Sequence, residues 1–315
     1  MDRLTNSPIG DCVVVRGHDH RFGEDFEVEA FIPHDLPSTI DLDHETWMAV
    51  TRASEQLGRL DAATELIPNP QLISRIATRR EAVGTSALEG TYTNLPDLLA
   101  AEAIGPSPDN DGGSVPANVR EVLNYTAAAD AAHEWIRERP ISIDMLSNLQ
   151  AQIVRGTPAE GESGVLRERQ VYIGPEDRPI TEARFVPPPH GVHLRTMVER
   201  WVDWLVNEDV RAHLPAVVRI ALAHYQFETL HPYVDGNGRV GRLVIILQLL
   251  SEGHLRAPAL PVSIWLHRHG DEYRNHLREL SQTGDWSPWV RFFATAVAEQ
   301  ARDGHDKVMQ LLTLQ

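Results

Sequence analysis

Cysteine is almost absent from this sequence. Cys12 is the only one in 315 residues, so no intramolecular disulfide can form and no cysteine-rich zinc site can exist. Such a composition is typical of proteins in a reducing compartment. The N-terminal residues include no apolar stretch of the kind that marks a secretory signal. We therefore expect a cytoplasmic protein.

Long hydrophobic runs and positive charge are also scarce. The longest aliphatic run in the expected helical core, Leu243–Leu247, is far shorter than the roughly 20 apolar residues that a membrane span needs. Lys and Arg total 29 against 45 Asp and Glu, which gives a net charge of −16. This balance disfavours nonspecific binding of nucleic acid or of an anionic membrane. We expect neither as a partner of this chain.

The hydrophobic pattern predicts an all-α fold. Trp47, Val50, Ala53, Leu57 and Leu60 recur at three- and four-residue spacing, which makes one apolar stripe of a helix that begins near residue 43. A further helix is expected after residue 94, with a proline in its first turn. The same reasoning predicts helices over residues 71–83, 117–138, 143–154, 192–207, 214–230, 238–252, 270–282 and 286–312.

Three stretches lack the helical period. Residues 1–40 are expected to form an irregular N-terminal arm with one or two short strands, and residues 155–191 a small β-hairpin or extended flap. Residues 105–116 form a loop by composition. We therefore divide the chain into an N-terminal arm (1–40), an N-terminal helical region (41–115) and a core with the C-terminal helices (116–315).

The expected helices 214–230 and 238–252 frame a loop rich in functional side chains. The first helix is amphipathic and the second is apolar on almost every side, which is typical of a buried helix. The loop between them is therefore fixed by a central scaffold, and such a scaffold can hold a site in a defined geometry.

The residues of this loop predict a polyphosphate site. Gly236 and Gly238 bracket Asn237 just before the buried helix, where backbone N–H groups and the helix dipole favour an anion. Arg239 and Arg242, three residues apart, add two guanidinium groups.

Asp235 is the only acid in the same loop, and beside phosphates its natural role is that of a Mg²⁺ ligand. His231 is positioned to accept a proton from an attacking hydroxyl. A bare Gly-Asn-Gly would favour a simple helix-to-helix turn with solvated arginines and a buried histidine. A chance match at all the specified positions of this loop would occur in roughly one chain per million.

The stretch His231–Arg242 resembles the Fic signature, HPFx(D/E)GNGRxxR, with Tyr233 in place of the usual Phe. In the family that position packs behind the loop, so the added hydroxyl needs a partner. The resemblance implies transfer of AMP from ATP to a Ser, Thr or Tyr hydroxyl of a protein. Gly238 favours nucleotidyl transfer, because the Doc kinase branch has Lys there.

The resemblance also implies a role for each matched position. His231 is the catalytic residue that deprotonates the acceptor hydroxyl, and Asp235 holds Mg²⁺ on the α- and β-phosphates. The glycines and the asparagine cradle the phosphates, and the two arginines bind their β/γ end. The implied nucleotide-binding stretch is Asp235, Gly236, Asn237, Gly238, Arg239, Val240, Gly241 and Arg242.

A second motif lies far upstream. Thr85–Gly90 is similar to the family's inhibitory pattern, [S/T]xxxE[G/N], and implies the autoinhibited subclass with an inhibitory helix before the core. We expect a short helix that delivers Glu89 to a guanidinium of the loop, most naturally Arg242. The alternative is that Glu89 is an ordinary acid at a helix end, with Gly90 as the cap.

Residues 167–189 resemble the family's target-docking flap. This resemblance implies that an unknown target protein docks there and that Ile173 and Gly174 contact the nucleotide. Tyr273 is a candidate to stack near the adenine, with packing as its alternative. Self-modification and a homodimer are both compatible with the sequence. Many members continue into a C-terminal winged-helix domain, which we do not expect in this chain.

Three functions remain open at this point. The first is a protein adenylyltransferase that uses ATP and Mg²⁺ and is inhibited by Glu89. The second is a de-AMPylase in which Glu89 positions a water. The third is a nucleotide-binding regulatory module without transferase activity, against which the intact His231 argues, since a pure binder needs no base.

Overall fold

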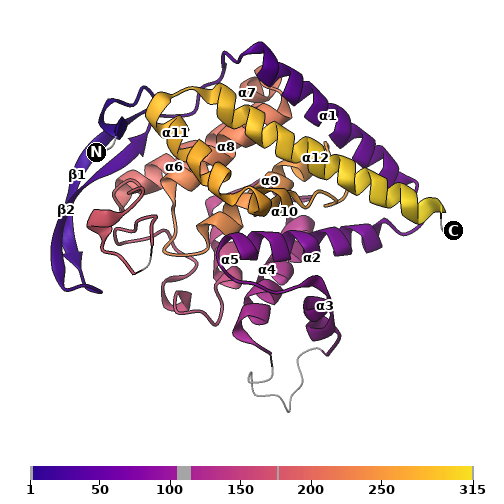
Figure 1. The fold of residues 1–315 in the computed structure, drawn as a ribbon, viewed down its shortest axis with the longest axis horizontal. Helices are drawn as coiled ribbons and strands as arrows, with labels where there is room; N and C mark the ends of the chain where they lie inside the picture. The colour runs from indigo at the N-terminus through magenta and orange to yellow at the C-terminus, as the bar shows by residue number, and fades with distance from the viewer. Residues whose placement is uncertain (1–2, 105–114, 176, 314–315) are drawn as a thin grey trace.

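The computed structural model describes residues 3–104, 115–175 and 177–313. Within these ranges the chain forms twelve α-helices and one two-stranded antiparallel sheet (Figure 1). The strands are β1 (Gly10–Asp19) and β2 (Glu24–Pro33), and three 3₁₀ helices are η1 (Arg3–Asn6), η2 (Glu160–Glu162) and η3 (Ile180–Glu182). The α-helices are α1 (His44–Glu65), α2 (Pro70–Leu88), α3 (Leu95–Ile104), α4 (Ala117–Trp135), α5 (Ile143–Ile153), α6 (Val192–Val206), α7 (Glu208–His213), α8 (Ala216–Leu230), α9 (Asn237–Ser251), α10 (Val262–Arg268), α11 (Gly270–Thr283) and α12 (Trp286–Thr313). The predicted all-α class is confirmed.

Helices α8 and α9 are the centre of the fold. In α9 every residue from Asn237 to Leu249 is buried, as its all-round apolar pattern predicted. Two core clusters meet at this pair. One contains Tyr225 of α8 with residues of α1, α10, α11 and α12, and the other contains Phe227 with residues of α4, α5 and α6. The loop between α8 and α9 is therefore anchored by both halves of the core.

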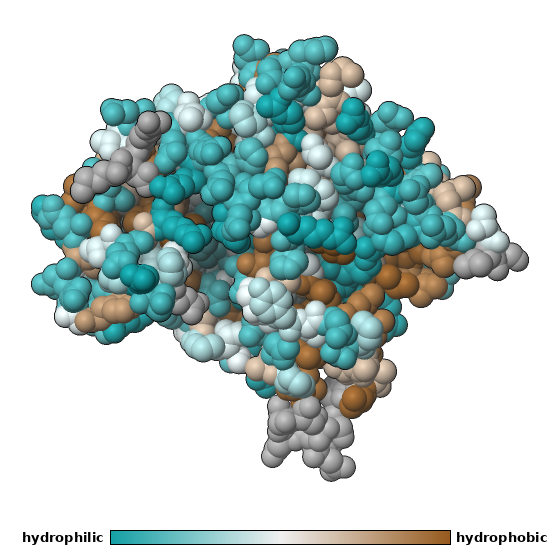
Figure 2. All heavy atoms as spheres, viewed as in Figure 1, coloured by the Kyte–Doolittle hydropathy of each residue, from teal (hydrophilic) through white to brown (hydrophobic). Residues whose placement is uncertain are grey.

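The surface of the helical body is largely polar. Figure 2 shows hydrophilic side chains over most of the face that carries α1 and α12, with a broader hydrophobic patch toward the C-terminal end of α12. Among the described residues, no helix is both long enough and apolar enough to cross a lipid bilayer.

Helix α2 is clamped onto α10 near its C-terminal end. The carboxylate of Glu81 accepts hydrogen bonds from the backbone N–H of Ser263, at 2.9 Å, and from the Ser263 hydroxyl. One turn later Gly84 lets the two backbones approach, because a Cβ there would lie only 2.8 Å from the nitrogen of Ile264. The end of α2 therefore has a fixed position relative to the core.

Several predicted boundaries are corrected by the structure. Helix α2 continues past residue 83 to Leu88, so Thr85 and Ser86 belong to its last turns and no separate short helix forms over 85–90. Gly84 does not end the helix, since its lack of a side chain serves the packing against α10. Helices α7 and α10 were missed, because six or seven residues show too little of the helical period.

The strands expected in the N-terminal arm are confirmed, and they are longer than predicted. The N-terminal arm contains a regular hairpin in which Gly10 pairs with Pro33 and Asp19 with Glu24. Of the two alternatives for residues 155–191, the structure has the extended flap, with one isolated bridge between Ile173 and Phe185 in its described part. Its prolines explain why no regular hairpin forms, because they lack the N–H that a ladder requires. These prolines are Pro175, Pro179, Pro187, Pro188 and Pro189. The proposed domain boundary near residue 115 adjoins residues 105–114, which lie outside the described ranges.

The close approach of α2 and α10 gives a stability test. Gly84→Ala should lower the free energy of unfolding by about 1–3 kcal/mol, because the new methyl group must push two backbones apart. Gly58→Ala in α1 is the matched control. A Cβ at Gly58 meets nothing within 4 Å, so this variant should gain about 0.5–1 kcal/mol of helix propensity. Urea denaturation measures both, and equal shifts for the two variants would contradict the packing described here.

Candidate active site

The site begins at the C-terminal end of α8. His231 follows the helix in a left-handed conformation, with φ of 47°, and is the only non-glycine residue with positive φ among the described residues. Such a conformation costs roughly 1–3 kcal/mol and persists only where the surroundings enforce it. Here the backbone N–H of His231 donates to the carbonyl of Phe227 at 2.9 Å, and Arg167 donates to the carbonyl of His231 at 2.8 Å.

Arg167 holds this corner of the chain together. Its side chain is buried, and it also donates to the carbonyls of Leu230, at 3.4 Å, and Pro188, at 2.5 Å. It therefore ties the flap to the end of α8. Sequence reasoning missed this residue, because nothing in its local sequence distinguishes it from a surface arginine.

The loop itself is closed by reciprocal hydrogen bonds. The side-chain oxygen of Asn237 accepts from the backbone N–H of Tyr233 at 2.8 Å, and its amide donates to the Tyr233 carbonyl at 2.8 Å. Tyr233 is fully buried, and its hydroxyl lies 3.3 Å from that of Ser147, which supplies the partner that the sequence required. Gln150 donates to the carbonyl of Asp235 at 2.9 Å. The side chain of Asn237 thus stabilises the conformation of the loop through the backbone of Tyr233.

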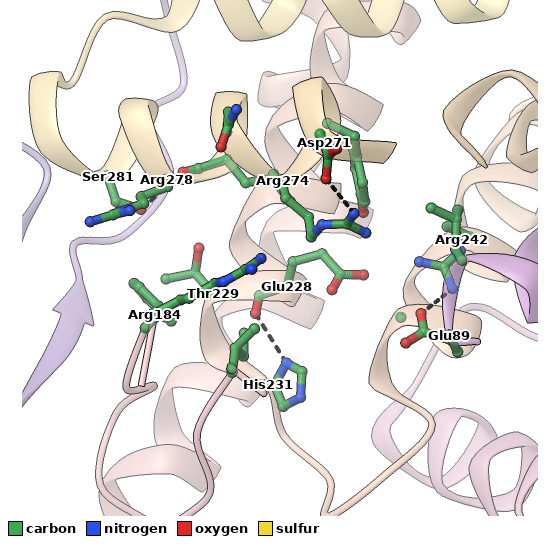
Figure 3. Close-up of a pocket in the computed structure, with 18 of the residues that line it drawn as sticks. Glu89, Arg184, Glu228, Thr229, His231, Arg242, Asp271, Arg274, Arg278 and Ser281 are labelled. Atoms are coloured by element: carbon green, nitrogen blue, oxygen red, sulfur yellow. Dashed lines mark hydrogen bonds and ion pairs between the residues drawn. The ribbon is translucent and has the colours of Figure 1, made fainter. Parts of the chain in front are cut away.

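A carboxylate from α2 lies against the first turn of α9. Arg242 is buried and donates through Nη2 to Oε1 of Glu89 at 2.5 Å (Figure 3). Its Nε donates to the Thr85 hydroxyl at 2.7 Å. A Cβ placed on Gly238 would lie 2.2 Å from the same Glu89 oxygen. The absence of a side chain at Gly238 therefore leaves room for an anion, and Glu89 fills it.

The position of Glu89 is unfavourable for the helix that carries it. It is the C-cap residue of α2, and a negative charge at a helix C-terminus opposes the helix dipole. Gly90 follows with φ of 82°, which is typical of a glycine that caps a helix. Glu89 is therefore a helix-end acid, as the alternative interpretation expected, and at the same time the partner of Arg242. Burial by itself would raise the pKa of Glu89, but the charge and hydrogen bond of Arg242 outweigh it and hold the pKa below the usual value.

Glu89 and His231 border two cavities. The first, of about 830 Å³, also contains Gly238, Arg242 and, at its edge, Tyr273. The second, of about 970 Å³, reaches Asp235. Ile173 and Gly174 of the flap touch both cavities, so the structure brings these predicted residues together. A volume of this size suits a ligand as large as a nucleotide.

Other predicted residues lie outside both cavities. Val240 is fully buried in the core, and a Cβ on Gly241 would lie 2.6 Å from Oε1 of Glu228, so both serve packing. Arg239 is buried and directed toward α4, where it pairs with Glu121 at 3.2 Å and with Asp235 at 3.5 Å. Gly236 and Asn237 shape the loop. Any contact of these residues with a ligand in the cavities is therefore through the backbone or after rearrangement.

Tyr273 is placed for packing. Its side chain is buried, its hydroxyl lies 2.7 Å from Nε2 of His224, and the two rings stack with centroids 5.9 Å apart. Because its ring already has a stacking partner in the core, the structure favours the packing interpretation over a base-stacking role.

His231 is held as a neutral imidazole. Burial, with the nearby charge of Arg167, lowers its pKa to about 4. The backbone carbonyl of Glu228 lies 3.4 Å from Nδ1. If this carbonyl accepts the ring proton, the tautomer has its hydrogen on Nδ1 and leaves Nε2 free to accept a proton. The residue can therefore act as a general base at neutral pH.

Sequence reasoning also missed Glu228. Its carboxyl lines the first cavity three residues before His231, and within the described part of the chain its buried Oε1 has no hydrogen-bond partner. Burial raises its pKa to about 7, against the opposing effect of Arg242. The only sequence signal would have been an acid inside an otherwise buried helix.

Residues 47–134 match the Fic/DOC family N-terminal model, and residues 140–249 match the Fic/DOC family model. The chain belongs to the Fic family. The signature loop and Glu89 both fall within the matched segments.

Individual Fic relatives agree with this assignment. The protein adenylyltransferases Fic of Drosophila willistoni and Drosophila virilis are each 36% identical over 133 residues. That alignment covers 42% of this chain and 23–24% of the relatives, so the chain spans about a quarter of their length.

Solved structures show the same fold. A Fic family protein from Desulfovibrio desulfuricans has a TM-score of 0.69 at 23% identity, covering 86% of this chain and 77% of its own. A Fic-domain signaling protein from Bacteroides thetaiotaomicron has a TM-score of 0.62 at 16% identity, covering 82% and 98%. These identities are low enough that the likeness concerns the fold alone.

The buried Glu228 gives a pH-dependent prediction. Its pKa is higher in the folded chain than in an unfolded one, so its ionisation opposes folding. The cost is absent below about pH 4.5, grows as the pH rises and is complete above about pH 7. Glu228→Gln should therefore raise the free energy of unfolding by about 1–3 kcal/mol at pH 8, and the gain should shrink toward pH 4.5.

Urea denaturation at several pH values measures this effect. The exposed Glu279→Gln on α11 is the matched control and should shift stability by less than about 0.5 kcal/mol at every pH. A Glu228→Gln variant that is less stable than wild type at pH 8 would show that the ionised carboxylate supports the fold through Arg242.

Proposed function

We propose that this chain is a protein adenylyltransferase that transfers AMP from ATP to a Ser, Thr or Tyr hydroxyl of a target protein or of itself. The observation that carries the proposal is the placement of a neutral His231 and the anion site of Gly238 and Arg242 on one cavity. Membership in the Fic family and the names of the Drosophila relatives support it.

In the proposed transfer of AMP, His231 takes the proton and each bond formed is matched by a bond broken. The acceptor hydroxyl oxygen attacks the α-phosphorus of ATP while Nε2 of His231 takes the hydroxyl proton. The new oxygen–phosphorus bond forms as the bond to the β-phosphate oxygen breaks, and pyrophosphate leaves. Arg242 and the N-terminus of α9 stabilise the negative charge on the phosphates. Correct placement of acceptor and nucleotide supplies much of the rate enhancement.

Mg²⁺ is the proposed metal, with Asp235 as its protein ligand. The Asp235 carboxylate is about half exposed (47%) and borders the cavity that also reaches His231. The described residues include no group of three or more acidic, histidine or cysteine side chains that could hold a metal alone. This arrangement fits Mg²⁺, which is typically held by one or two carboxylates with phosphate oxygens and water. When bound, the ion neutralises phosphate charge.

The same contacts support autoinhibition by Glu89 as part of the proposal. Its carboxylate lies against Gly238 and pairs with Arg242, the two groups that an anionic phosphate would use. Carboxylate and phosphate cannot occupy that space together. ATP would then bind weakly or in an unproductive position until Glu89 moves.

The proposal is tested by label transfer from radioactive ATP with Mg²⁺ to the protein itself. Glu89→Gly should raise the initial rate about ten- to hundredfold over wild type, because a charge-assisted pair is worth roughly 1.5–3 kcal/mol. Glu89→Gly combined with His231→Ala should lose the gain and fall a further ~10²–10⁴-fold, since release of the anion site cannot replace the base.

Each outcome separates the open functions. A double variant as fast as Glu89→Gly would contradict the role of His231. Nucleotide binding without label transfer in any variant would favour the regulatory module. Loss of AMP from a previously labelled protein, faster in wild type than in Glu89→Gly, would favour the de-AMPylase.

A further inference from the structure

One strand of the N-terminal hairpin has a free edge. β1 pairs with β2 along its whole length, and the described part of the chain places no further strand beside it. In Figure 1 the hairpin forms one side of the molecule, apart from the helical body. An edge strand presents a row of unpaired backbone N–H and C=O groups, which can pair with a strand of another chain.

The contact between the hairpin and the flap shows which backbone groups of β1 point outward. The backbone N–H of Phe31 donates to the carbonyl of Val186 at 2.9 Å, so it points away from β1. Phe31 lies opposite Cys12, and inward- and outward-pointing residues alternate along an antiparallel pair. The residues of β1 whose backbone groups point away from β2 are therefore Cys12, Val14, Arg16 and His18. Among the described residues none of these outward groups has a hydrogen-bond partner.

The edge of β1 lacks the features that keep edge strands from pairing, which are short length, lysine, proline and bulges. β1 has ten residues without lysine or proline, and its one-to-one register with β2 leaves no bulge. Val14, in the middle of the outward series, is 57% exposed. The one arginine in that series, Arg16, is already paired with Glu27 of β2 at 2.7 Å.

The other edge of the sheet, along β2, is protected. Its outward-pointing series contains Phe31, which is bound to the flap, and Pro33, which has no N–H to donate. The other members of that series are all acidic, and charged side chains discourage pairing at an edge. They are Asp25, Glu27 and Glu29. The hairpin can therefore accept a strand at β1 but not at β2.

β1 is complementary to a second copy of itself when the two Val14 residues face each other across a two-fold axis. In this register the outward-pointing groups of both strands meet over residues 10–18. Val13 of each copy then lies opposite Val15 of the other, so the centre of the pair consists of valines. Cross-strand pairs of β-branched side chains stabilise a sheet.

The charges of β1 favour the same register. Asp11 lies opposite Gly17 of the second copy, and Arg16 lies opposite Cys12, so no like charges face each other. An axis at Val15 would bring Asp11 opposite Asp19, which are two negative charges. An axis at Val13 would shorten the paired segment to residues 10–16.

We propose that β1 pairs with β1 of a second copy of this chain, so that the two hairpins form one continuous antiparallel sheet across a two-fold axis. Symmetric pairing uses both free edges at once, and the protected edges of β2 stop growth at two chains. An unrelated peptide strand is the other partner that an edge could take, and the self-complementary register favours the second copy. The proposal does not rest on AMP transfer.

Sedimentation velocity across the micromolar range measures this association. Wild type should shift from one chain toward two as its concentration rises, and further in high salt, which screens the repulsion between copies that each carry a net charge of −16. Val14→Pro should weaken the association about tenfold or more, because it removes an outward N–H that the pairing with β2 does not use.

Val14→Thr keeps the N–H and the branched Cβ, so it is the matched control and should stay within about threefold of wild type. A wild type that stays a single chain, equal association of Val14→Pro, or growth beyond two chains would overturn the proposal. Label transfer is not part of this measurement, so its loss would count only against the proposed function.

Disulfide crosslinking tests the register. In a Cys12→Ser background, Val14→Cys places two thiols across the two-fold axis, where the Cα separation of about 5.5 Å in a hydrogen-bonded pair suits a disulfide. Oxidised glutathione should convert this variant to a covalent dimer. Wild type should not crosslink, because Cys12 faces Arg16 of the second copy rather than its own counterpart.

Val192→Cys in the same Cys12→Ser background is the matched control, since Val192 is 79% exposed and lies on α6, away from the hairpin. It should remain uncrosslinked under the same conditions. Crosslinking of wild type through Cys12, or equal crosslinking of the Val14→Cys and Val192→Cys variants, would show that the strands do not pair in this register and would overturn the proposal.

Discussion

A buried guanidinium needs a counter-ion, and the site depends on how Arg242 obtains one. Its side chain is buried near the N-terminus of α9, which together with α8 forms the buried centre of the fold, and an unpaired charge there would cost several kcal/mol. The partner comes from a distant part of the sequence, Glu89 at the end of α2. Arg242, Gly238 and the N-terminus of α9 together define a place for negative charge. In this structure the protein's own carboxylate fills that place.

The need to place a counter-ion beside Arg242 also explains why the C-terminal end of α2 is fixed to the core. Glu81 and Gly84 fasten its last turns to α10, and Thr85 accepts from Arg242 one turn before Glu89. A carboxylate on a mobile segment would lose much of its advantage to conformational entropy. Because the backbone of α2 is fixed, we expect release of the anion site through rotation of the Glu89 side chain, which is 39% exposed, rather than through unfolding of the helix.

The sequence predicted the features that follow from local pattern. The buried helix α9, the loop from His231 to Arg242 and the acid at position 89 could all be read from periodicity, spacing and motif. The sequence did not predict what depends on contacts between distant segments. Arg167 and Glu228 resemble ordinary charged residues until the fold buries them, and Arg239 turns toward α4 because Glu121 lies there. The strands of the N-terminal hairpin were predicted but too short. Residues 155–191 left a hairpin and an extended flap open, and the prolines there decide for the flap.

The central claim is that Glu89 and a nucleotide phosphate compete for Arg242. The most direct measurement is the calorimetric affinity of wild type and Glu89→Gln for ATP and for AMP under identical conditions. Glutamine keeps the shape of the side chain but removes its charge. The account predicts that the variant binds ATP about tenfold more tightly while its affinity for AMP changes less than twofold, since only the longer phosphate chain extends to the Glu89 position. An unchanged affinity for ATP, or an equal gain for both nucleotides, would contradict it.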